Sequence, residues 1–213
     1  YEMTKNIFHS YGYGYRPWET IFVDLDRTNK NKRIKNYNTR REIKLIKEKN
    51  PTIKKVENFE DYKKYLDYFF NSEGHSNYPN KMKFYNLIAW QNLKINQEFF
   101  IIKLNNTPHA LFSARTYKTR AYWTMVGRII KYKYSLHAYA INFLCEYLSI
   151  KKIKFLDLAG YNPSPSNQKE RGIKFFKEKF AGKIIHQPTF IYDNTSLVKS
   201  LRSRVNYFKN KKT

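Results

Sequence analysis

Acidic residues are scarce in this chain of 213 residues, which has 17 Asp and Glu against 41 Lys and Arg. The resulting formal net charge is +24. Charge of this size does not specify a fold, but it favours polyanionic partners such as nucleic acid, nucleotide phosphates or an anionic membrane face. A general compositional bias toward Lys, Asn, Ile, Tyr and Phe explains the same charge without any partner, so both interpretations stay open.

Cysteine and glycine are also rare. Cys145 is the only cysteine, so no internal disulfide can form and nothing indicates secretion. The histidines are scattered and no second cysteine accompanies them, so we expect no metal site. The 7 glycines make neither a Walker nor a dinucleotide-binding pattern, and we expect no tightly bound cofactor.

Long apolar runs are missing as well. The opening YEMTKNIFHS contains none, which predicts neither a signal peptide nor a transmembrane helix. The expected location is therefore the cytoplasm, with the inner face of the membrane as the place where an anionic surface would be met.

Apolar side chains in general are plentiful, because 41% of the residues are hydrophobic and 18% are aromatic. This supplies the core of one domain, for which we expect residues 20–213, with residues 1–19 as an extension or the remnant of a preceding segment. Periodicity predicts an antiparallel meander and further strands. The strands are expected at 20–25, 54–58, 98–104, 108–117, 121–127, 153–158 and 183–193. Helical spacing covers 30–49, the segment after Asn58, the segment after Asn80, 134–150, the segment before Gly182 and the segment after Asn194. The order predicts an α+β protein with a mixed, mostly antiparallel sheet flanked by helices.

The stretch FLDLAGYNPSPSNQKERGIKFFKEKFAG (155–182) holds the candidate chemistry. It indicates a buried strand with Asp157 near its end, a polar loop, and a short basic helix that carries Lys177 beside Phe176. A cation such as Lys177 stabilises the oxyanion that forms in acyl transfer, although a surface lysine would fit the same pattern. Asp157 either accepts or orients an amine proton or caps the following loop. Tyr161 and Asn162 either line the cleft or only form the turn.

Basic and aromatic residues are interleaved in the meander, in RTYKTRAYWTMVGR (115–128). Alternation along a strand places Arg115 and Tyr117 on one face, and Trp123 follows on the next strand. Such a mixture suits phosphates together with stacked bases or sugars, and an aromatic packing face is the alternative. Further candidate substrate contacts are His75 and Tyr78 in the loop after 71.

Two patterns resemble the Fem family (FemABX) of peptidoglycan-bridge aminoacyltransferases, whose domains are variants of the GNAT acyltransferase fold. The helix NYNTRREIKLIKEKNP (36–51) is similar to the family's basic T-R-x-x-I-x-x-A-x-K helix. Asp157-Leu-Ala-Gly, then Gly172-Ile-x-x-Phe-Lys-x-x-Phe-x-Gly182, is similar to D-x-G-G…G-I-x-x-F-K-x-x-F-G-G. The likeness spans roughly residues 20–208, with Ala159 and Ala181 in place of glycines. Family members usually carry two such domains, and this chain has room for one.

The resemblance implies a single GNAT-like domain in which Lys177 stabilises the oxyanion. It implies aminoacyl-tRNA as donor and an amine of a cell-envelope precursor, either a peptidoglycan stem peptide or an amino sugar, as acceptor. An acetyl-CoA donor is the alternative, but the segment 127–139, where a CoA-binding loop is expected, has no glycine after Gly127. The candidates for contacts with tRNA or phosphate are Arg40, Arg41, Lys131 and Lys133. A non-catalytic RNA-binding protein on the same fold is a further alternative.

Overall fold

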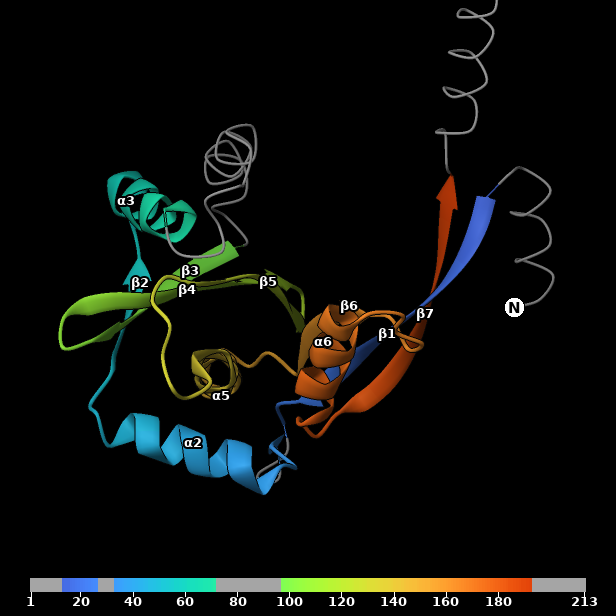
Figure 1. The fold of residues 1–213 in the computed structure, drawn as a ribbon, viewed down its shortest axis with the longest axis horizontal. Coiled ribbons are helices and arrows are strands. Elements are labelled where there is room, and N and C mark those ends of the chain that lie inside the picture. Colours follow the sequence, from blue (N-terminus) through green and yellow to red (C-terminus); the bar gives the residue numbers. More distant parts are fainter. Residues whose placement is uncertain (1–12, 27–32, 72–96, 193–213) are drawn as a thin grey trace, which may run out of the picture.

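A computed structural model describes residues 13–26, 33–71 and 97–192. Their strands form one seven-stranded sheet in the order β2-β3-β4-β5-β6-β1-β7 (Figure 1). The strands are β1 (Tyr13–Asp24), β2 (Thr52–Val56), β3 (Gln97–Leu104), β4 (Thr107–Tyr117), β5 (Arg120–Arg128), β6 (Phe155–Tyr161) and β7 (Lys183–Tyr192). Only β5 and β6 pair in parallel, whereas the other neighbours are antiparallel. This confirms the predicted α+β fold with a mixed, mostly antiparallel sheet.

The described helices are α2 (Tyr37–Lys47), α3 (Phe59–Phe70), α5 (Leu136–Ile150) and α6 (Gln168–Glu178). Each begins after a polar residue whose side chain accepts a hydrogen bond from a backbone N–H of the first turn. These caps are Asn36, Asn58, Ser135 and Asn167. A cap of this kind satisfies a backbone donor that has no partner inside the helix. The helix predicted after Asn58 is confirmed, whereas the first predicted helix begins later than expected, at Tyr37. The helices predicted after Asn80 and after Asn194 lie outside the described residues.

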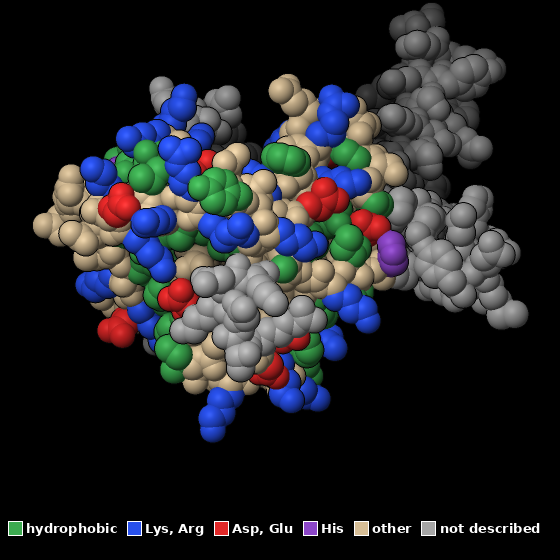
Figure 2. All heavy atoms as spheres, turned by 90° about the horizontal axis from the view of Figure 1, so that it is seen from below, with side chains coloured by type: hydrophobic (Ala, Val, Ile, Leu, Met, Phe, Trp, Pro, Cys, Tyr) green, Lys and Arg blue, Asp and Glu red, His purple; other side chains and the backbone are tan. Residues whose placement is uncertain are grey.

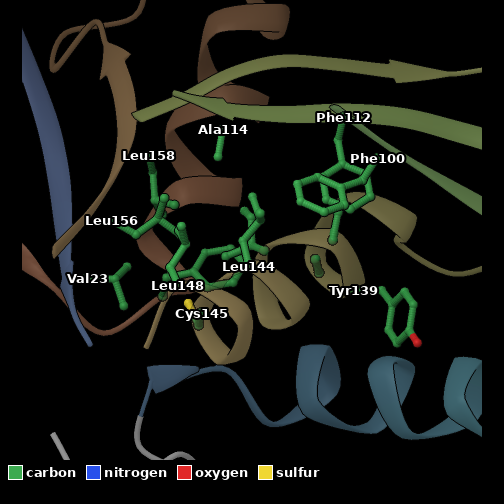
Figure 3. Close-up of a cluster of buried hydrophobic side chains, with 14 of the residues drawn as sticks. Val23, Phe100, Phe112, Ala114, Tyr139, Leu144, Cys145, Leu148, Leu156 and Leu158 are labelled. Atoms are coloured by element: carbon green, nitrogen blue, oxygen red, sulfur yellow. The ribbon is translucent and has the colours of Figure 1, made fainter. Parts of the chain in front are cut away.

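The sheet has helices on both sides, with α2 and α5 on one and α3 on the other (Figure 1). Alternation in β3 serves both sides, because Phe100 and Ile102 belong to the main core while Phe99 and Ile101 belong to a smaller core against α3. Figure 3 shows the main core, where Phe100 and Phe112 stack with ring centroids 5.3 Å apart and point toward α5. Helix α5 is mostly apolar because it is buried here, and Cys145 is one of its buried residues.

Strand β1 is longer than the sequence indicated, since it begins at Tyr13 and not at Thr20. All but its last two residues pair with β7, in a continuous register from Tyr13–Tyr192 to Phe22–Lys183. Residues 13–19, which the sequence assigned to an extension, are therefore part of the sheet. Figure 1 shows this two-stranded arm of β1 and β7 reaching away from the rest of the sheet.

The sheet opens between β5 and β6. Their pairing is limited to three positions, from Arg120–Phe155 to Tyr122–Asp157. Beyond these positions β5 continues to Arg128 and β6 to Tyr161 without pairing with each other. The candidate site lies at this point of separation.

Candidate functional site

Strand β6 carries a bulge at Ala159. Thr20 pairs with Gly160 and Phe22 pairs with Asp157, so Leu158 and Ala159 together lie opposite the single residue Ile21. Ala159 has a φ of 62°, in the left-handed region where a side chain other than glycine is strained by about 1 kcal/mol. The Fem-like pattern has glycine at this position, which is the residue that such a φ favours.

Asp157 and Thr20 are both buried at the base of the bulge, 4% and 0% exposed. The Asp157 carboxylate accepts a hydrogen bond from the Ala159 N–H at 2.8 Å. The same carboxylate oxygen also accepts a hydrogen bond from the Thr20 hydroxyl, which is 137 positions away in the sequence. Of the two roles predicted for Asp157, this geometry supports the one in which the carboxylate holds the backbone that follows it.

Lys177 reaches the bulge from α6. Its ammonium donates to the carbonyl oxygens of Ala159 at 3.0 Å and Gly160 at 2.8 Å. Burial lowers the pKa of Lys177 to about 8, against the opposing influence of the Asp157 charge. An ammonium has three N–H donors, so one remains for a further acceptor. Lys177 is therefore mostly protonated at neutral pH and held with a donor to spare.

A hollow of about 470 Å³ lies beside the bulge, where β5 leaves β6. Its lining consists of Arg115, Tyr117, Tyr122, Trp123, Thr124 and Ala159. Ala159 is shared between this hollow and the Lys177 anchor. Three predicted substrate-binding residues thus line one hollow, and the predicted cation is bonded to its edge.

Thr124 was not predicted as a contact, and Tyr122 was predicted only as a member of the interleaved segment. Thr124 is an additional residue in β5, because Trp123 pairs with Ala114 and Met125 with Ser113. Its hydroxyl accepts from Gln97 at 2.9 Å and lies 2.9 Å from the Ser113 hydroxyl. No local signal marks such a bulge, although both residues belong to the interleaved segment that the sequence singled out.

Three other predicted residues do not line the hollow and instead stabilise the structure around it. Tyr161 is buried in the main core. Burial and the neighbouring Glu19 carboxylate raise the pKa of its hydroxyl. Among the described residues, this hydroxyl has no hydrogen-bond partner within normal geometry. Asn162 donates to Glu170 at 2.9 Å and accepts from the Ser164 N–H, so it shapes the turn.

Phe176 is the third of these residues. Its ring packs edge-on against His137 and Phe180, with centroids 6.2 Å and 5.6 Å apart. Burial lowers the pKa of His137, with a further contribution from Arg128. Phe176 thus packs α6 against the core and positions the adjacent Lys177, but it does not line the hollow.

The predicted phosphate contacts lie elsewhere. Arg40 donates to the carbonyls of Ile34 and Lys35 at 2.6 Å and 2.9 Å, and it lines a groove of about 330 Å³ that also includes Lys44 and Lys47. The Lys133 ammonium lies 4.8 Å from the Tyr134 ring centroid. Arg41 and Lys131 are exposed. His75 and Tyr78 fall outside the described residues.

The face that carries α2 is predominantly basic. Figure 2 views the molecule from this side and shows Lys and Arg side chains spread over it, with fewer acidic ones between them. Among the described helices, none combines the length and the apolar character that a membrane span requires.

Comparisons with known proteins bear on the fold. No family model matches the sequence, and a search of curated proteins finds no match either. Among solved structures, FemX superimposes with a TM-score of 0.66 at 9% identity, over 92% of this chain and 70% of that one. L-PGS from Bacillus licheniformis gives 0.58 at 12% identity, over 95% and 70%.

A tandem GNAT protein from the clavulanic acid biosynthesis pathway gives a TM-score of 0.50 at 6% identity, over 88% of this chain and 58% of that one. The C-terminal domain assigned to a lysylphosphatidylglycerol synthetase from Agrobacterium fabrum gives 0.58 at 11% identity, over 95% and 69%. At such low identities the similarity concerns the path of the chain. It shows that this protein has a GNAT-like fold.

Proposed function

We propose that the protein is an N-acyltransferase that transfers an aminoacyl group from aminoacyl-tRNA to an amino group of a cell-envelope precursor. The observation that carries the proposal is the Lys177 ammonium, held by two backbone carbonyls at the edge of the hollow with one N–H left over. The similarity of fold to FemX and to L-PGS supports it.

Acyl transfer requires a positively charged hydrogen-bond donor near the carbonyl oxygen of the aminoacyl ester. The acceptor amine attacks the carbonyl carbon of the aminoacyl ester, and the carbonyl oxygen becomes an oxyanion. The remaining N–H of Lys177 stabilises this oxyanion. Collapse breaks the ester C–O bond, so that an amide forms, the tRNA hydroxyl leaves with a proton, and the amine loses one.

The hollow suits the end of a nucleic-acid donor. Tyr117, Tyr122 and Trp123 offer aromatic faces, and Arg115 offers a fixed positive charge among them. Base stacking on aromatic side chains contributes about 1–3 kcal/mol for each base, and a guanidinium pairs well with phosphate. The excess positive charge of the chain supports the approach of a polyanion.

The choice of tRNA over acetyl-CoA depends on the segment before α5. A CoA pyrophosphate is commonly held by glycine-rich backbone at a helix N-terminus. Here Lys131 and Lys133 precede the Ser135 cap, and no glycine lies between Gly127 and α5. This supports the tRNA donor, and a lipid-linked acceptor would bring the basic surface to the inner face of an anionic membrane.

The experiment offers both donors to the purified chain. Bulk tRNA charged with radiolabelled amino acids is tested in parallel with labelled acetyl-CoA. Each donor is given a peptidoglycan stem-peptide precursor or an amino-sugar nucleotide. We expect label to move from tRNA to an amine in a linkage that survives mild base. Transfer from acetyl-CoA alone would make the protein an acetyltransferase, and salt-dependent tRNA binding without any transfer would make it an RNA-binding protein.

A further inference from the structure

We propose that Thr20 and Asp157 are positioning residues for Lys177, which act through the β6 bulge and never touch substrate. The inference rests on the proposed function for its catalytic consequence only. The structural part, that this buried pair holds the two carbonyls that grip the ammonium, can be tested without any substrate.

The backbone of the β6 bulge needs an external restraint. Ala159 lies at a φ of 62°, which a residue with a Cβ adopts at a cost of about 1 kcal/mol. Such a conformation persists only when its surroundings determine it. The Asp157 carboxylate supplies this restraint by accepting from the Ala159 N–H at 2.8 Å.

Thr20 contacts the bulge from the neighbouring strand. Its hydroxyl bonds the same Asp157 oxygen and also lies 2.9 Å from the Ala159 carbonyl oxygen. Thr20 therefore touches both the carboxylate that holds the bulge and one of the two carbonyls that bind Lys177. Because Thr20 is fully buried in β1, this contact ties the bulge to the neighbouring strand.

Gly160 is held from the other side by Trp18. A Cβ built on Gly160 would lie 1.4 Å from the Trp18 indole nitrogen, so the indole packs directly on the backbone there. The Gly160 carbonyl accepts from Lys177 at 2.8 Å. Both carbonyls of the anchor are thus fixed by β1, through Thr20 in one case and Trp18 in the other.

Asp157 itself is poorly placed to exchange protons with a substrate. Its carboxylate is buried and already accepts two hydrogen bonds, and in the described part of the chain it makes no ion pair with Lys177. Its charge nevertheless favours the protonated lysine. Position and charge together keep Lys177 an ammonium that points one N–H away from the bulge.

The test compares Thr20→Val, which removes the hydroxyl at nearly constant shape, with Thr20→Ser, which keeps it. The first readout needs no substrate: Lys177 is labelled by reductive methylation at a series of pH values, and the peptide is quantified by mass spectrometry. The native chain should give a midpoint near pH 8. In Thr20→Val the released ammonium should titrate at least about one unit closer to a free lysine, while Thr20→Ser should keep the native midpoint.

The second readout is transfer, with kcat and KM measured separately. Thr20→Val should lower kcat at least about tenfold with donor KM within about twofold, because the donor contacts are intact. Thr20→Ser should restore kcat. An unchanged labelling midpoint in folded Thr20→Val would overturn the positioning role. Full transfer activity in Thr20→Val together with an inactive Asp157→Asn would also overturn it, because these two results would make Asp157 the base that takes the substrate proton. If the native chain transfers nothing, the labelling midpoint still decides the structural claim.

Discussion

Among the described residues, two of the places where lysine lies near a carboxylate have opposite effects on stability. One is the Glu98 cluster, in which Glu98 of β3 binds Lys55, Lys151 and Tyr147. The other is the bulge, where Lys177 lies near Asp157 but bonds to carbonyls instead. The first is built to join elements, and the second keeps a cation partly buried.

In the Glu98 cluster every hydrogen-bonding group finds a partner. The Lys151 ammonium donates to both carboxylate oxygens at 2.7 Å and 2.8 Å, the Lys55 ammonium lies 2.7 Å from one of them, and the Tyr147 hydroxyl donates at 2.8 Å. Burial alone would raise the pKa of Glu98, but these bonds outweigh it and lower it. The same bonds raise the pKa of Lys55 and, against its own burial, that of Lys151.

At the bulge the balance is reversed. Burial dominates the pKa of Lys177 and lowers it to about 8, which means that the folded state disfavours this charge. A group whose charged form is destabilised by folding is a candidate for function. The comparison therefore separates a lysine that stabilises the fold from one that the fold tolerates.

The largest expected effect comes from Lys177→Met, which keeps the length of the side chain and removes the charge. Loss of one oxyanion donor typically lowers kcat by about 10²–10³-fold. Stability should rise by about 1 kcal/mol, because the desolvated charge is gone while two carbonyls lose a donor. Transfer assays and urea denaturation measure the two quantities. Lys169→Met, an exposed lysine on the same helix, is the control and should change neither. A full-speed Lys177→Met enzyme would remove the mechanism.

The pH dependence follows from the same group. Transfer requires the ammonium, so kcat should fall about tenfold per pH unit above pH 8. Stability should move the other way: between about pH 8 and pH 10.4 the unfolded chain holds the proton that the folded chain has lost, so folding becomes more favourable as pH rises. Denaturation at pH 7.5 and pH 9.5 checks this sign. Lys177→Met should lose that part of the slope, and an identical slope in both proteins would contradict the assignment.

Local patterns carried much of this site. The interleaved basic and aromatic residues led to Arg115, Tyr117 and Trp123, and the Fem-like pattern led to Lys177. The structure gathers them around one hollow and its edge. Thr20 could not be found in this way, because it is 137 positions from Asp157 and only the β1–β6 pairing joins them.

Tyr161 shows how the bulge changes which side chains face the core. Unbroken alternation from Leu156 and Leu158, which face the core, would turn residue 161 away from it. The extra residue at the bulge reverses the alternation and sends Tyr161 into the core. The Fem-like D-x-G-G pattern indicated the position of the bulge in β6, but a bulge with alanine at a positive φ has no strong sequence signal.

A smaller effect is expected at the Glu98 cluster. Glu98→Gln removes the charge that holds Lys55 and Lys151, both more than 40% exposed, so the loss should be about 1 kcal/mol or less. It should be full at neutral pH, begin to decline near pH 4.5, the unfolded value of the Glu98 pKa, and be lost as pH falls through the lowered folded pKa. Transfer should be unchanged. A loss of activity here would mean that the two lysine–carboxylate arrangements are not independent.

The smallest effect tests the strain at the bulge. Ala159→Gly relieves the left-handed φ of 62° and adds backbone freedom to the unfolded chain, so the net gain in stability should be only about 0.5 kcal/mol. The Lys177 labelling midpoint should stay near its native value, because the carbonyls of 159 and 160 keep their places. Gly182→Ala is the opposite case: its Cβ would lie 2.5 Å from the Phe22 carbonyl oxygen, so it should destabilise the fold. If Ala159→Gly instead lowered stability, the alanine methyl would be packing usefully in the hollow that it lines, and the bulge would be held by shape more than by the Asp157 and Thr20 bonds.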